Sequence, residues 1–171
     1  CLVCNVTGET SELMRMDGDG VRAHATFPTG FNALLRTLRT HGGLSEHEAR
    51  SILRLAKYPK HSRGERPSTA LKIFDESFHS AADEFTSHFK NAVKELLSPG
   101  DILRVRVVGA EPAGEWFARA LAADESLSEL FPDGGEVRAV RSHHLTPHIE
   151  AHAEVPDLLL MLDALFADSG V

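Results

Sequence analysis

The sequence predicts an α/β fold: a mixed five-stranded sheet, made of an antiparallel three-strand meander plus two parallel strands, flanked by helices. Three short strand patterns come first along the chain, and each of two later strand patterns is reached through a helical one. Tight turns join antiparallel strands. Strands joined through a helix pair in parallel, because parallel pairing needs a long crossover connection. Such a sheet needs helices on both faces.

The first strands form the meander. Leu2–Val6 is a continuous apolar run, which is typical of a central strand. Residues 13–16 follow a turn that contains Thr, Gly and Ser, and residues 17–20 (Asp-Gly-Asp-Gly) are a strong hairpin signal. Residues 21–27 alternate apolar and polar side chains, so we expect a half-buried strand with Val21, Ala23, Ala25 and Phe27 on one side. Asp17 and Asp19 belong to the exposed hairpin turn on this interpretation.

The middle of the chain is predicted to be helical. After Gly30, apolar residues recur at helical spacing up to Leu38. Ser45 and Glu48 form a capping box for a second helix. Residues 57–67 are basic, contain two prolines and have no apolar period, so we expect an exposed loop. Residues 68–97 predict a long helix whose stripe of phenylalanines belongs to the core.

The last third of the chain repeats a strand–helix pattern. Residues 105–108 predict a short buried strand, a helix carrying Trp116 and Phe117 follows, and residues 137–140 predict another strand. A helix that starts at Pro156 closes the chain. We expect a single domain over residues 1–171, in which 1–42 and 98–171 form the sheet with its helices. Residues 43–97 then form a helical lobe and the long helix. Because the chain starts at Cys1, without a Met and directly on an apolar run, we also expect a fragment of a longer protein.

Composition excludes two classes of function. The net charge is −7 and Lys and Arg are scattered, which argues against a nucleic-acid-binding protein. No apolar stretch is long enough to insert into a membrane. Cys1 and Cys4 have redox-motif spacing, but positions i and i+3 of a strand point to opposite faces, so we interpret both as small buried hydrophobic residues.

Four stretches carry a resemblance to a known family. Residues 2–11 look like a second phosphate-binding hairpin, residues 27–32 like the strand-to-helix turn that follows it, and residues 107–110 like an adenosine loop. Residues 43–49 resemble the Gly-Leu-Ser-x-x-Glu-Ala segment that opens a small lobe beside the nucleotide. With the order of elements, the chain resembles the second half, the ribonuclease-H-like subdomain, of an actin-like ATPase-fold protein of the PilM/FtsA type.

The resemblance implies a set of nucleotide-binding positions. A tight hairpin can present backbone N–H groups to phosphate oxygens, an acid at its start can hold the hydrated magnesium ion, and glycines let the backbone approach closely. The positions that match are Asn5, Thr7, Gly8, Glu9, Thr10, Ser11, Gly30, Gly109 and Ala110. No catalytic residue is assigned.

This sequence departs from the family pattern at four places. Asn5 stands for the expected Asp, Thr7 for a Gly, and Glu111 for a small residue, while Arg50 and Leu53 replace Glu and Lys. Losing the magnesium-binding carboxylate removes a main part of the charge stabilisation in phosphoryl transfer. We therefore expect impaired or absent ATPase activity, and an enzyme is the less favoured interpretation. No cofactor is assigned to the chain, and ATP with magnesium stays open for a full-length protein.

Three hypotheses about function follow. The first is a cytoplasmic scaffold in a PilM-like type IV pilus or division-type assembly, peripheral to the inner membrane, which binds protein partners and lacks its N-terminal half here. The second is an ATP-binding actin-like switch or ATPase half-domain. The third is a metal-binding module in residues 143–152, where His144, His148 and His152 have i, i+4, i+8 spacing, although Pro147 would break a helix there.

Overall fold

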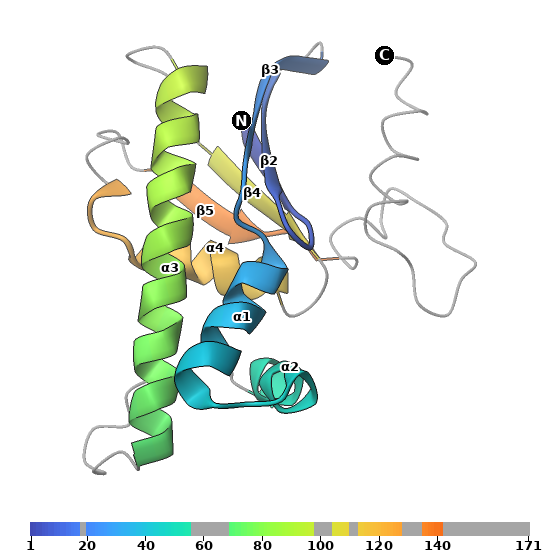
Figure 1. The fold of residues 1–171 in the computed structure, drawn as a ribbon. Helices are drawn as coiled ribbons and strands as arrows, with labels where there is room; N and C mark the ends of the chain where they lie inside the picture. The colour runs from blue at the N-terminus through green and yellow to red at the C-terminus, as the bar shows by residue number, and fades with distance from the viewer. Residues whose placement is uncertain (18–19, 56–68, 98–103, 110–112, 128–134, 142–171) are drawn as a thin grey trace.

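Five strands form one mixed sheet in the order β3-β2-β1-β4-β5 in the computed structural model of the chain (Figure 1). The structure describes residues 1–17, 20–55, 69–97, 104–109, 113–127 and 135–141. The strands are β1 (Leu2–Val6), β2 (Ser11–Asp17), β3 (Gly20–Phe27), β4 (Arg104–Gly109) and β5 (Glu136–Ala139). The three-strand meander is antiparallel, and β1–β4 and β4–β5 are parallel pairs. The predicted fold class is confirmed.

Within the described residues, four helices flank this sheet: α1 (Phe31–Gly42), α2 (Glu46–Leu55), α3 (Thr69–Leu96) and α4 (Ala113–Ala123). The capping box of α2 is present, because Ser45 N donates to Glu48 Oε2 at 2.8 Å and Glu48 N donates to Ser45 Oγ at 3.3 Å. α3 and α4 share one face of the sheet, where Phe85 and Phe117 lie 4.2 Å apart between ring centroids. The predicted loop at 57–67, the closing helix from Pro156 and the histidine segment lie outside the described residues.

The core lies between this sheet face and the helices α3 and α4. Alternate residues of β1 (Leu2, Cys4 and Val6) point into it and are buried. From α3, Phe85 and Phe89 are fully buried, and Phe85 makes an edge contact with Phe27 at 5.5 Å. The stripe of phenylalanines is thus core, as predicted, where its side chains are described.

Two expectations for single residues are wrong. Cys1 is exposed, whereas Cys4 is buried and its burial raises the pKa of its thiol to about 12. Val21 is also exposed, at 55%. A β-bulge explains Val21, because Arg15 pairs with Ala23 but Met16 pairs with Val21, so one extra residue of β3 breaks the alternation.

No helix of the described residues is both long and apolar enough to cross a membrane. No group of three or more His, Cys, Asp and Glu side chains within the same described ranges could hold a metal ion.

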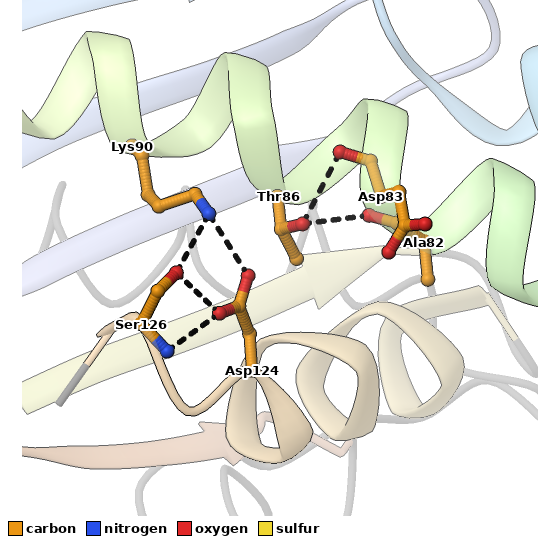
Figure 2. A network of polar contacts seen from close by, with 6 residues as sticks. All are labelled: Ala82, Asp83, Thr86, Lys90, Asp124 and Ser126. Carbon is orange, nitrogen blue, oxygen red and sulfur yellow. Dashed lines mark hydrogen bonds and ion pairs between the residues drawn. The ribbon is translucent and has the colours of Figure 1, made fainter.

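A polar network ties α3 to the segment after α4 (Figure 2). Lys90 Nζ donates to Asp124 Oδ2 at 3.1 Å and to Ser126 Oγ at 2.8 Å. Asp124 Oδ1 accepts from Ser126 N at 2.9 Å and from Ser126 Oγ at 2.5 Å, which closes a turn at the end of α4. Burial raises the pKa of Asp124, but the hydrogen bonds from Ser126 and Lys90 outweigh it and the net pKa is lowered.

The Phe85→Ala variant should lose about 3–5 kcal/mol of unfolding free energy, because the side chain is fully buried between two aromatic neighbours. Urea denaturation measures it. The control is Glu84→Ala, an exposed neighbour on the same helix, which should change stability by less than about 0.5 kcal/mol. Equal losses in the two variants would contradict the position of the core.

The Asp124→Asn variant should lose about 1 kcal/mol of stability at pH 7, because Lys90 loses its charged partner. The depressed folded-state pKa means that the Asp124 contribution is complete above the ordinary value of 3.8 and is lost as pH falls below it. Between pH 7 and pH 3, the wild type should therefore lose more stability in urea denaturation than this variant does.

Asp83→Asn is the matched control, because the Asp83 side chain is exposed and only its backbone oxygen makes a contact in Figure 2, as the acceptor of a hydrogen bond from Thr86 Oγ1. It should follow the wild-type pH profile. A wild-type profile in Asp124→Asn would show that the carboxylate is not stabilised by folding.

Candidate functional site

The turn between β1 and β2 is closed by its own threonines. Thr7 N donates to Thr10 O at 3.0 Å, and Thr7 Oγ1 donates to the same oxygen at 2.7 Å. Thr7 stands where the family pattern has Gly, and its hydroxyl is used inside the turn. The side chain that marks the departure therefore helps to hold the hairpin in shape.

The same turn lies against the N-terminus of α1. Phe31 N donates to Thr7 O at 2.8 Å, and Asn32 N donates to Gly8 O at 2.7 Å. Gly30, the residue before the helix, provides no side-chain cap, and a Cβ there would stand 2.6 Å from Thr7 O. The first N–H groups of a helix have no partner within the helix, so the hairpin carbonyls cap α1. Gly30 is required because any larger residue would separate the two.

Glu9 places a carboxylate beside this helix end. Its Oε1 accepts from Asn32 Nδ2 at 2.9 Å and its Oε2 from Arg36 Nη1 at 2.7 Å. These hydrogen bonds, from Arg36 first and Asn32 second, lower the pKa of Glu9. A negative charge at this position is also favoured by the dipole of α1. The place where a helix would attract an anion is thus already occupied by one.

An open groove of about 280 Å³ lies next to Glu9, between α1 and α2. Three arginines (Arg36, Arg39 and Arg50) and two glutamates (Glu9 and Glu46) line it. Arg50 is held by Glu46 at 2.9 Å, and Arg36 by Glu9 at 2.7 Å. Both acids are therefore paired within the groove, and its charges largely compensate one another.

A second layer of contacts supports the hairpin. Ser11 Oγ donates to Thr29 O at 2.6 Å in a buried position. Thr29 Oγ1 also forms a short hydrogen bond with His88 Nδ1 of α3. The start of β2, the end of β3 and the long helix are therefore joined at one point behind the turn.

Asn5 and Gly109 lie near the carboxyl ends of the parallel strands. Asn5 is opposite Val108 in the β1–β4 register, and its Oδ1 is buried without a hydrogen-bond partner in the described part of the chain. A Cβ on Gly109 would stand 3.2 Å from Val6 O and 3.4 Å from Gly114 N, so this glycine lets β4, β1 and α4 approach closely. Ala110 and Glu111 lie outside the described residues.

The structure therefore brings most of the predicted positions to one edge of the sheet. Asn5, the turn from Thr7 to Ser11, Gly30 and Gly109 all lie where β1 and β4 end. The sequence interpretation missed Asn32 and Arg36, which hold Glu9. Their i, i+4 spacing directly after Gly30 could have indicated a shared face beside the turn. No sequence signal pointed to His88.

Comparisons with known proteins identify the fold of the chain. No family model and no curated protein matches the sequence. Among solved structures, a chain of the "PilM-PilN type IV pilus biogenesis complex" is similar over 82% of this chain and 35% of its own length, at 16% identity and a TM-score of 0.56. The ethanolamine utilization protein EutJ from Carboxydothermus hydrogenoformans is similar over 80% and 42%, at 14% identity and a TM-score of 0.52.

The chain has the fold of an actin-like half-domain. The half-domain spans less than half the length of each of these two proteins. At these identities the likeness concerns the fold alone. The predicted resemblance is confirmed at that level, and the roles of the site residues stay predictions.

The Gly30→Ala variant should lose about 1–3 kcal/mol of unfolding free energy, because its Cβ would meet two backbone oxygens of the turn at 2.6 and 2.8 Å. Gly8→Ala is the control, since its Cβ would meet only the flexible Asn32 side chain, at 3.2 Å. Gly8→Ala should lose less than about 1 kcal/mol. Thermal denaturation measures both, and a Gly30→Ala variant as stable as Gly8→Ala would contradict the docking of the turn on α1.

Proposed function

We propose that the half-domain is a structural module that binds protein partners, and that its phosphate hairpin is closed to nucleotide. The observation that carries the proposal is the capping of α1 by Thr7 O and Gly8 O. Phosphate binding at a helix N-terminus needs free N–H groups. Here the first two donate to the hairpin, and the carboxylate of Glu9 stands beside them.

The departures in sequence support the same conclusion. Asn5 replaces a magnesium-binding carboxylate, and its amide carries no charge with which to attract a divalent cation. Hydrolysis of ATP depends on magnesium to neutralise the developing charge on the phosphates. The proposed module therefore has impaired or absent ATPase activity.

The similarity to a pilus-biogenesis chain supports an assembly role. That solved structure is a complex of PilM with PilN. For the half-domain we propose a corresponding scaffold role, on the cytoplasmic face of an inner-membrane assembly of the pilus or division type. A preceding half-domain would complete the actin-like unit.

Titration of the ¹⁵N-labelled chain with Mg-ATP tests the closed hairpin. We expect the amide signals of Thr7, Phe31 and Asn32 to stay in place, because each of these N–H groups already donates to a backbone oxygen and is not free for phosphate. Sodium sulfate at equal ionic strength is the control for salt effects. Saturable, magnesium-dependent shifts at these amides would overturn the proposal and favour the alternative, an ATP-binding half-domain.

A further inference from the structure

β5 is the edge strand of the sheet within the described part of the chain, and no described residue pairs with the backbone groups on its outer side. It pairs with β4 alone among the described strands (Figure 1). In a parallel pair, alternate residues direct both backbone groups at the neighbouring strand. Val140 N donates to Val107 O at 2.8 Å, so Arg138 also faces β4, whereas Val137 and Ala139 direct their N–H and C=O groups outward. No described residue pairs with them.

A groove follows this edge. It measures about 310 Å³ and lies between α4 and β5. Its floor is made of small apolar side chains, namely Ala118, Ala122, Val137 and Ala139. The side chains of Val137 and Ala139 therefore line the groove while their backbone groups point along its open side. Small side chains leave room for an incoming strand to approach the backbone of β5.

The rim of the groove is basic. Arg119, Arg138 and Arg141 line it, against the single acid Glu115. Glu115 is held by Arg141 at 2.5 Å and by Arg119 at 3.6 Å. The side chain of Arg138 forms an ion pair with Glu136 and is 69% exposed. In a chain of net charge −7, this excess of arginine creates a local positive field that favours an acidic ligand.

We propose that this groove binds an acidic, extended peptide of a partner protein, which adds to the sheet as a strand beside β5. Backbone hydrogen bonds to Val137 and Ala139 supply the affinity, as in other cases of strand addition. Alternate small side chains of the peptide lie over the alanines of α4, and its carboxylates, which point to the opposite face of the added strand, pair with Arg138. Such a peptide would belong to a partner of the proposed scaffold, and the inference rests on the proposed function only at this point.

The probe is a fluorescein-labelled peptide in which Glu and Val alternate, and fluorescence polarisation at low and moderate salt measures its binding to the whole chain. We expect saturable binding that weakens with salt. A peptide with Lys in place of Glu should not bind. Because the readout is peptide affinity, failure here is distinct from failure of the Mg-ATP experiment, which concerns the hairpin.

Four variants locate the binding site. Arg119→Gln with Arg138→Gln should weaken the affinity at least about tenfold. Ala139→Pro should do the same while leaving every charge in place, because Ala139 N–H faces away from β4 and its loss removes only an outward donor. Ala122→Glu, at an exposed position of α4, should repel the peptide. Arg22→Gln is the matched control, since Arg22 lies on β3 at the opposite edge of the sheet and should bind as the wild type does.

Circular dichroism melting checks that each variant folds. If Ala139→Pro does not fold, the arginine and Ala122 variants test the location of the binding site. Unchanged affinity in these variants, or an equal loss in Arg22→Gln, would overturn the proposal. Sedimentation of the chain without peptide gives a further check. A dimer that Ala139→Pro dissociates would show that a second copy occupies the edge, and it would also overturn the proposal.

Discussion

The donation of two α1 amides to the carbonyls of the β1–β2 turn organises one whole end of the molecule. Phe31 N and Asn32 N reach Thr7 O and Gly8 O, and this contact is possible only because Gly30 has no side chain. Ser11 and Thr29 join the strands directly behind it, and His88 extends the connection to α3. An uncapped helix start at this point would leave these two N–H groups without their backbone partners, so the turn and the helix depend on each other.

Because of this contact, the hairpin has the backbone shape of a phosphate loop, but the N–H donors at the helix start are already occupied. The hairpin, Gly30 and Gly109 keep the close backbone approaches that such a loop needs. Its nearest helix donors, however, already have partners, and Glu9 adds a negative charge beside them. Opening the site would cost those hydrogen bonds and bring phosphate against a carboxylate. On the proposed function, the fold is kept by its packing while nucleotide chemistry is lost.

The sequence predicted the succession of strands and helices, and which strands are antiparallel or parallel, because these follow from local patterns and general rules. Alternation, helical spacing and crossover length are properties of short segments, and the capping box of Ser45 and Glu48 is local as well. The exposure of Val21 could not be predicted in this way, since a bulge depends on the pairing of two strands. Other contacts join residues that are distant in sequence, namely Glu9 with Asn32 and Arg36, and Thr29 with His88. No local pattern determines such contacts.

The hairpin and the basic groove lie at different parts of the sheet. The closed hairpin lies where β1 and β4 end, whereas the basic groove follows the outer edge of β5 beside α4. Electrostatic attraction in solution extends over about 8–10 Å at physiological salt, so the arginines of the groove can favour an acidic segment despite the negative charge of the chain as a whole. Binding at this edge would extend the sheet without disturbing the capped helix. On the proposed function, the half-domain acts as a scaffold through this edge while its hairpin stays closed to nucleotide.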